Sequence, residues 1–284
     1  MHVPDGFIDA PVSIGAGAVA AAGVAVSLRG ARRELDERTA PLAGLVAAFI
    51  FAVQMLNFPV AAGTSGHLLG GALAAILVGP CTGVLCVSVV LLMQGLLFAD
   101  GGLTALGVNV TDMAITTVVV AYVLFRLLVK VLPRGRRSVT AAAFVAAAAS
   151  VPAAAAVFTV IYAVGGVTDV PLSKVAGSMI GVHVLIGLGE AAITALTVGS
   201  VLAVRPDLVH GARGLERPLE LHTRPGTAKA AQDGHGRPEK AAPEAPAAPE
   251  APEAPARHSA PAAPADAGRT TPSGVRDRPQ DAKA

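Results

Sequence analysis

The longest uncharged run in this chain constrains its fold more than any other feature. Between Thr39 and Ala99, 61 consecutive residues contain no Asp, Glu, Lys or Arg. A soluble helix needs a polar face, whereas a membrane-spanning helix needs about 20 mostly apolar residues. A run of this length therefore predicts several membrane spans rather than a series of soluble helices.

The composition of the whole chain agrees with this prediction. Of 284 residues, 53% are hydrophobic and 15% are charged, whereas about a quarter of the residues in a soluble domain are charged. The net charge of +2 is too small to indicate a nucleic-acid partner. The two cysteines, Cys81 and Cys86, cannot form a disulfide scaffold. These numbers exclude an enzyme built on a large soluble core.

The character of the chain reverses near residue 210. The last 74 residues contain 12 of the 21 prolines, and Pro-Glu-Ala and Ala-Pro units recur from Pro243 to Pro264. Such a segment lacks the apolar side chains that offset chain entropy, so we expect it to be disordered or extended. We therefore divide the chain into a membrane domain at 1–209 and a Pro/Ala/Glu-rich disordered tail at 210–284.

The apolar segments predict the number of crossings. Five candidates lie at about 10–28, 41–59, 105–131, 139–164 and 179–203. The remaining stretch, 62–99, contains the helix-breaking pair Gly79-Pro80 near its middle. It can form one span with ragged ends or two spans joined by a tight turn.

Basic residues decide between these two possibilities. They gather in three clusters, which are Arg29, Arg32, Arg33 and Arg38; Arg126, Lys130, Arg134, Arg136 and Arg137; and Arg205, Arg213 and Arg217. If residues 62–99 form two spans, an even number of crossings separates each cluster from the next. All three clusters then lie on the cytoplasmic side, as the positive-inside rule requires. The predicted fold class is an all-α integral membrane protein with seven transmembrane helices. Its N-terminus would lie outside and its tail in the cytoplasm.

The first nine residues do not resemble a signal peptide, because they contain two acids and no Lys or Arg. Pro4-Asp5-Gly6 predicts a turn, and Asp9 predicts the N-cap of a helix with Pro11 in its first turn. We expect Met1 to be the mature N-terminus, since a bulky residue at position 2 normally blocks methionine removal.

A free N-terminus makes residue 2 chemically interesting. The Met1 amine, the backbone nitrogen of His2 and the His2 imidazole can close adjacent five- and six-membered chelate rings on one divalent metal ion. Planar nitrogen ligation suits Ni(II) or Cu(II) and can also hold Co(II). The alternative is that His2 is an incidental second residue.

A second histidine supports the metal interpretation. His67 is the only histidine in the 61-residue run, and the topology puts it near the outer end of the third span, on the same side as Met1. Ionisable groups at membrane depth are costly and are functional candidates by default. His67 would supply a fourth nitrogen. The alternative is a neutral histidine that is hydrogen-bonded between helices.

Other polar residues could orient these ligands. Gln54 and Asn57 are expected to share a helix face at the outer end of the second span, and Asn109 and Asp112 to do the same in the fifth. Gln94 and Asp100 flank the outer end of the fourth. Hydrogen bonding between helices without any metal role is an equal alternative for each of them.

The last span contains two further buried candidates. His183 and Glu190 lie seven residues apart on one predicted face, where they could form a polar pair, and a direct ligand role for either stays open. The two cysteines lie beside the inner Gly79-Pro80 turn, across the membrane from His67, and are not included in the site. The tail histidines are too scattered to define one.

Several motifs in order resemble the CbiM/NikM family. They are Met1-His-Val-Pro-Asp-Gly-Phe7, Gln54-Met-Leu-Asn-Phe-Pro-Val60, Gly63-Thr-Ser-Gly-His-Leu-Leu-Gly-Gly71, Gln94-Gly-Leu-Leu-Phe-Ala-Asp-Gly-Gly-Leu-Thr-Ala-Leu-Gly107 and Gly181-Val-His-Val-Leu-Ile-Gly-Leu-Gly-Glu190. The resemblance covers about residues 1–207. It implies the substrate-capturing membrane component of a cobalt or nickel energy-coupling-factor transporter, with seven helices and an inserted N-terminus. It also implies Met1, His2 and His67 as metal ligands.

The resemblance further implies partners, namely an ATPase pair, a transmembrane coupling subunit and often a small accessory membrane subunit. The sequence contains no GK[ST] Walker loop, so the chain is expected to be a transport subunit and not an enzyme. No cofactor is expected, and Co(II) or Ni(II) would be the transported ligand. Rival interpretations are a self-sufficient secondary transporter of a divalent cation, an intramembrane metalloenzyme and a structural membrane subunit. The sequence contains neither the paired carboxylates nor the HExxH motif that the first two would need.

Overall fold

The computed structural model of this chain describes residues 1–37, 39–59 and 65–213. The chain divides into two units, Met1–Glu220 and Leu221–Ala284, and the described residues all belong to the first. The predicted tail lies outside the described residues from position 214 onward. The elements, in chain order, are α1 Ala10–Glu34, α2 Thr39–Gln54, β1 Phe58–Pro59, β2 Ser65–Gly66, α3 Gly71–Val78, α4 Pro80–Leu97, α5 Leu106–Asn109, a π-helix Val110–Thr116, α6 Thr117–Val131, α7 Arg136–Gly165, α8 Leu172–Val204 and two 3₁₀ turns at Pro206–Leu208 and His210–Ala212.

The described unit is a helical bundle, which confirms the all-α prediction. β1 and β2 pair over only two residues each. Five helical segments of the described chain are long and apolar enough to cross a membrane: α1, α4, the continuous run α5 to α6, α7 and α8. α2 is apolar but shorter, and α3 has eight residues. The predicted third crossing therefore contains only a short helix, preceded by the segment that includes His67.

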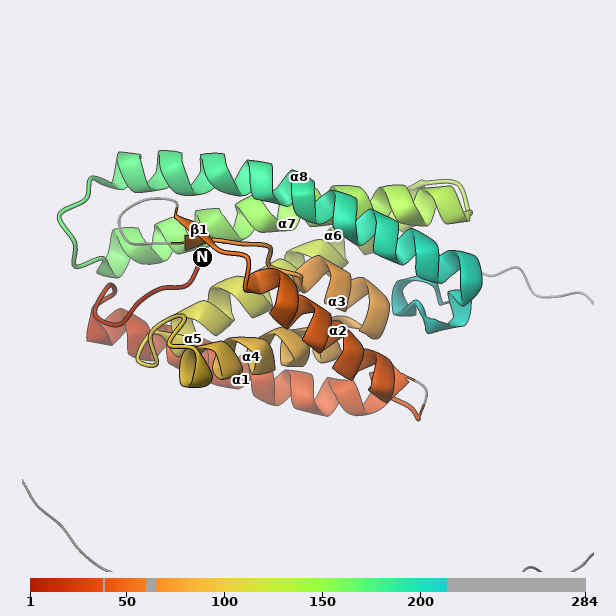
Figure 1. Ribbon diagram of the computed structural model, residues 1–284, viewed down its shortest axis with the longest axis horizontal. Coiled ribbons are helices and arrows are strands. Elements are labelled where there is room, and N and C mark those ends of the chain that lie inside the picture. Colours follow the sequence, from red (N-terminus) through yellow and green to blue (C-terminus); the bar gives the residue numbers. More distant parts are fainter. Residues whose placement is uncertain (38, 60–64, 214–284) are drawn as a thin grey trace, which may run out of the picture. The chain divides into compact units, whose positions relative to one another are not determined.

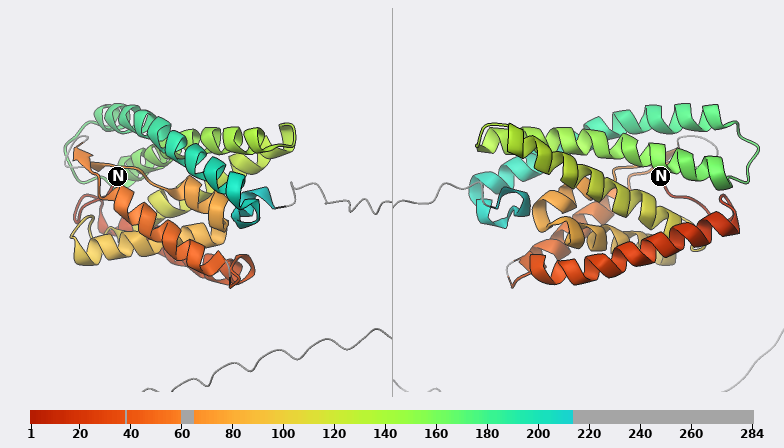
Figure 2. Two further views of the ribbon diagram at one scale, coloured as in Figure 1. Left: turned by 45° about the vertical axis from the view of Figure 1, so that its right-hand side comes forward. Right: turned by 180° about the vertical axis from the view of Figure 1, so that it is seen from behind.

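α3 lies at the centre of the bundle (Figures 1 and 2). All eight of its residues are buried, and it contacts α2, α4, α6, α7 and α8. A helix that is apolar on every side requires such an environment. The second 3₁₀ turn also packs against α3, and Val209 and Ala212 are buried there.

The helix break at Gly79-Pro80 occurs as predicted. Gly79 has a φ of 102°, a left-handed value that favours glycine, and Pro80 begins α4. The carboxylate of Glu34 accepts hydrogen bonds from the backbone N–H groups of Cys81 and Thr82. The end of α1 thus caps the start of α4.

The segment from α5 to α6 is one helix with a π-helical turn near its N-terminal end. The turn contains Asp112, which is fully buried. π-Helical turns are rare and often occur at functional sites. At the start of this segment, a Cβ on Gly107 would collide with the backbone of Gly17 in α1. Glycine at position 107 therefore lets α5 approach α1 closely.

The N-terminal turn and helix cap are confirmed. Gly6 has a φ of 73°, and Asp9 accepts a hydrogen bond from the backbone N–H of Val12 at 3.0 Å, with Pro11 in the first turn. The residues before this turn do not extend away from the bundle but lie inside it. The N-terminus is consequently surrounded by helices (Figure 1).

Candidate metal centre

The first three residues are buried inside the bundle. Met1 and Val3 have no exposed surface, and His2 is 5% exposed. Burial of a chain end is unusual, because its amine and backbone groups must then find partners or a function inside the protein.

Val3 is the main attachment point of this segment. Its N–H donates to Asn109 Oδ1 at 2.8 Å, and its carbonyl accepts from Asn109 Nδ2 at 3.3 Å. The same carbonyl accepts from the N–H of Gly102 at 2.8 Å. A single amide side chain thus pairs with both backbone groups of Val3, as a neighbouring strand would.

Two further attachments fix the segment beyond Val3. The Asp5 carboxylate accepts hydrogen bonds from the backbone N–H and the hydroxyl of Thr104, and these bonds lower the pKa of Asp5. On the opposite side, Asp9 N donates to Gly165 O at 2.7 Å at the end of α7. The ring of Phe7 packs 5.5 Å from that of Tyr162, measured between centroids. The inserted N-terminus is therefore anchored at both of its sides.

The structure brings the rings of His2 and His67 together. Their centroids are 4.5 Å apart and the ring planes are 25° from parallel. His67 is fully buried, and its Nδ1 lies 2.8 Å from the carbonyl of Leu68. A carbonyl can only accept, so Nδ1 carries the proton and Nε2 is left with a free lone pair. That Nε2 has no hydrogen-bond partner among the described residues.

Asp100 contacts the other histidine. Its Oδ1 lies 3.0 Å from His2 Nδ1, an ion-pair distance, although neither ring nitrogen of His2 has a well-aligned hydrogen bond. Asn57 Nδ2 donates to Asp100 Oδ2 at 3.0 Å, and the His2 and Asn57 contacts lower the pKa of Asp100. The preceding Ala99 has a φ of 52°, a strained value for alanine.

The amine of Met1 has an unusual protonation equilibrium. Burial lowers its pKa from 8.0 to about 5, although the negative charges of Asp112 and Asp100 oppose this shift. The amine is consequently neutral at pH 7 and has a lone pair available for a metal ion. The site therefore contains a neutral amine beside two imidazole rings.

Polar groups without partners gather around these residues. Both carboxylate oxygens of Asp112 and Nε2 of His183 are unpaired among the described residues, and both side chains interact electrostatically with the Met1 amine. Gln94 in α4 is also buried with both of its amide atoms unpaired. Most buried polar groups in proteins are paired, so such a cluster requires an explanation. Within the described chain no three His, Cys, Asp or Glu side chains form a metal-binding group.

Two predicted pairings are wrong. Gln54 and Asn57 do not share a helix face, because α2 ends at Gln54 and Asn57 lies in an exposed position after it. His183 and Glu190 do not form a polar pair. Nδ1 of His183 lies 2.7 Å from the Met179 carbonyl, whereas Glu190 accepts from backbone N–H groups of another segment.

Gln54 and Glu190 instead hold the segment that follows His67. Gln54 Nε2 donates to the carbonyl of Leu69 at 2.7 Å. The Glu190 carboxylate accepts from Leu69 N at 2.7 Å and from Gly70 N at 3.1 Å. This role of Glu190 was not predicted from the sequence, where the available signal was a lone acid in an apolar helix.

The cysteines lie apart from these residues. The backbone N–H of Cys81 is bonded to Glu34 at the start of α4, and the thiol of Cys86 donates to the carbonyl of Ala43 in α2. Both thiols are free.

Comparison with known proteins identifies the family. Residues 2–208 match the CbiM family model, described as a cobalt uptake substrate-specific transmembrane region. The chain belongs to this family. Its similarity to the family extends over all the helices described above.

Individual relatives agree with this assignment. A protein of Haloquadratum walsbyi named for metal transport is 40% identical over 209 residues, which are 74% of this chain and 93% of the relative. The fused nickel transport protein NikMN of Rhodobacter capsulatus is 34% identical over 240 residues, which are 79% of this chain and 68% of the relative. The crystal structure of a truncated transition metal transporter matches with a TM-score of 0.62 and 27% identity, covering 72% of this chain and 99% of that one.

The family and the apolar helices together define a multi-pass membrane protein of prokaryotes that acts in cobalt or nickel transport.

The attachment of Val3 generates a test. Asn109→Leu keeps the side-chain size but leaves the buried N–H of Val3 unpaired, so we expect a loss of about 1–3 kcal/mol in the free energy of unfolding. Hydrogen–deuterium exchange should accelerate in residues 1–8. Ser178→Ala is the control, since that hydroxyl bonds to Lys174 O within α8, and should change stability by less than about 0.5 kcal/mol. Unchanged exchange in Asn109→Leu would contradict the assigned attachment.

Proposed function

We propose that this chain is the substrate-binding subunit of an energy-coupling-factor transporter that takes up Co(II) or Ni(II). The metal ion, as transported substrate, would be held by the Met1 amine, the backbone nitrogen and imidazole of His2, and Nε2 of His67. The observation that carries the proposal is the burial of a neutral N-terminal amine beside two histidine rings.

The chemistry of these donors supports a late divalent metal. Four nitrogen atoms, including a deprotonated backbone amide, form a planar set that suits Ni(II) and also accepts Co(II). His67 presents Nε2 because Nδ1 donates to Leu68 O. A chelate ring through the His2 backbone uses Nδ1, so the metal would replace Asp100 as the neighbour of that nitrogen.

The proposed topology has seven crossings, with the metal site near the outer face and the basic clusters in the cytoplasm. In this arrangement the short α3 and the segment before it make the third crossing, and residues 1–209 form the membrane domain, followed by the Pro/Ala/Glu-rich tail. A transmembrane coupling subunit and an ATPase pair, with or without a small accessory membrane subunit, would supply the energy. The name of the fused NikMN relative is consistent with a linked membrane partner.

A self-sufficient secondary transporter is the alternative, and it would need free carboxylates along a proton path. Glu190 does not offer one, because both of its oxygens accept backbone hydrogen bonds. Asp112 is buried with both oxygens unpaired, but one such group does not make the chain of carboxylates that a proton path requires.

The N-terminal chelate can be tested by adding two residues before Met1, because a single added residue would make His2 the third residue from the new amine and create another four-nitrogen chelate. The extension removes the amine from its position, so we expect the affinity for Ni(II) and Co(II) to fall by more than about 100-fold, beyond the effect of changing residues around a metal site. Mass spectrometry of the intact protein first establishes that the native chain begins at Met1. Isothermal titration calorimetry of the purified protein then measures both affinities.

Two histidine variants complete this experiment. His67→Ala should weaken binding in the chain with a native N-terminus, whereas His210→Ala, which alters a histidine outside the site, should not. Equal affinities for the native and extended chains would contradict the Met1–His2 chelate.

The pKa of Met1 predicts how affinity depends on pH. Because burial lowers this pKa to about 5, the amine is already neutral at pH 7, so of the Met1 amine and the His2 amide only the amide loses a proton on binding. Between pH 7 and 8 the logarithm of the association constant should therefore rise with a slope of about one. Amine protonation should weaken binding further only below about pH 5. A slope near two between pH 7 and 8 would indicate an ordinary, exposed amine and would contradict the account.

A further inference from the structure

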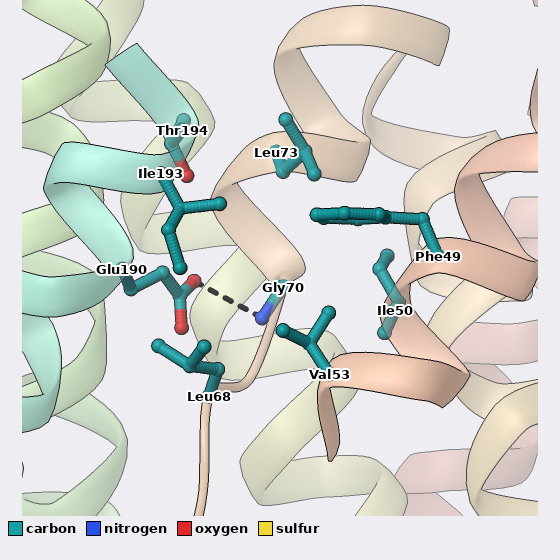
Figure 3. A pocket seen from close by; sticks show the side chains of 9 residues that line it. All are labelled: Phe49, Ile50, Val53, Leu68, Gly70, Leu73, Glu190, Ile193 and Thr194. Carbon is teal, nitrogen blue, oxygen red and sulfur yellow. Dashed lines mark hydrogen bonds between the residues drawn. The ribbon is translucent and has the colours of Figure 1, made fainter. Parts of the chain in front are cut away.

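The segment between His67 and α3 is held by a carboxylate from a distant part of the chain. Leu69 is fully buried, so its N–H needs a partner inside the protein. Glu190 of α8 supplies that partner at 2.7 Å and also accepts from Gly70 N at 3.1 Å. Figure 3 shows the Glu190 side chain extending from α8 to Gly70 at the start of α3.

These bonds are connected to the ring of His67 through a short path. The ring nitrogen Nδ1 donates to the carbonyl of Leu68, the residue directly before Leu69. The peptide unit that joins Leu68 and Leu69 contains both that carbonyl and the N–H that Glu190 accepts. Glu190 therefore fixes the plane of the peptide group that orients the His67 ring.

The surroundings make this contact hard to replace. Glu190 is 2% exposed, and a pocket beside it is lined by apolar side chains of α2 and α8, including Val53 and Ile193 (Figure 3). Gln54 holds the Leu69 carbonyl from α2 but does not contact its N–H. Without the carboxylate, the buried N–H of Leu69 and the partly buried N–H of Gly70 would lose their partner.

We infer that Glu190 is a positioning residue for the metal ligand His67, and that it couples the position of α8 to the geometry of the metal site. The inference rests on the proposed function, because it assumes that His67 binds the metal. A displacement of α8 relative to α3 would pull the Leu68–Leu69 peptide group and turn the Nε2 lone pair away from the metal. Glu190 thereby links a helix movement to metal release.

The chain contains a matched control for this inference. Glu34 accepts from Thr82 N at 2.7 Å and Cys81 N at 3.1 Å at the start of α4, and it is 9% exposed. Each glutamate thus accepts one bond of 2.7 Å and one of 3.1 Å from two consecutive backbone N–H groups. Only Glu190 contacts the segment that leads to His67.

The test compares Glu190→Gln with Glu34→Gln in the full-length protein, using Ni(II) and Cu(II) as probes. The oxygen of the glutamine amide can accept a hydrogen bond from one of the two backbone N–H groups, but its NH₂ group is a donor and cannot pair with the other. Both variants should therefore lose similar thermal stability. Glu190→Gln should bind Ni(II) on the order of 10- to 100-fold more weakly. Its visible absorption band should shift, because the fourth nitrogen is misplaced. Glu34→Gln should keep the native spectrum and an affinity within about twofold.

Distinct outcomes separate this inference from the proposed function. A native spectrum and affinity in Glu190→Gln would overturn the inference, and so would an equal change in both variants, which would indicate a purely structural effect. If Glu190→Gln does not fold, Glu190→Asp, which keeps the charge but shortens its reach, should show the same shift to a smaller extent. Native protein that binds metal equally with and without an N-terminal extension would instead overturn the proposed function.

Discussion

The pairing of Asn109 with both backbone groups of Val3 determines most of the geometry at this end of the bundle. A chain end carries a charge and several unpaired backbone groups, so it normally remains in water. Here one amide side chain and the N–H of Gly102 satisfy Val3, and the two residues before it enter the protein interior. Burial then makes the Met1 amine a weak base. The same interaction that anchors the segment therefore also prepares the amine to bind a metal ion.

The second half of the site depends on a short helix that is buried on all sides. α3 does not extend further toward His67, because Gly70 has a left-handed φ of 78° and the backbone groups of Leu69 are bonded to Gln54 and Glu190. At the other end of α3, Glu34 bonds to the first turn of α4 in the same way. Glu190 stabilises the non-helical backbone before α3, and Glu34 pairs with N–H groups in the first turn of α4. Inside an apolar bundle, such groups would cost several kcal/mol each if they were unpaired. The two carboxylates also connect α3 and α4 to α8 and α1, so helix movements reach the site.

Local features of the fold could be predicted from the sequence, whereas contacts between distant segments could not. The uncharged run of 61 residues, the Gly79-Pro80 break and the Asp9 cap follow from hydropathy and backbone preferences, and the structure contains the corresponding helices, break and cap. The predicted end of the second span was wrong, because no strong helix breaker in the sequence marks the end of α2 at Gln54. Asn57 lies after this end and therefore outside the helix. Glu190 was predicted to pair with His183 because both lie on one helix face. Its partner in the structure is the backbone N–H of Leu69, which is 121 residues away in sequence. No periodicity within a helix can reveal such a partner.

The ligand set can be measured directly by X-ray absorption spectroscopy at the metal edge of the Ni(II)-loaded protein. The account predicts four nitrogen neighbours in a plane, two of them with the outer-shell scattering of imidazole, and the edge feature typical of square-planar nickel. The same chain extended before Met1 should lose this feature. A six-coordinate spectrum dominated by oxygen, or one with sulfur neighbours, would contradict the claim that the buried N-terminus and His67 hold the metal.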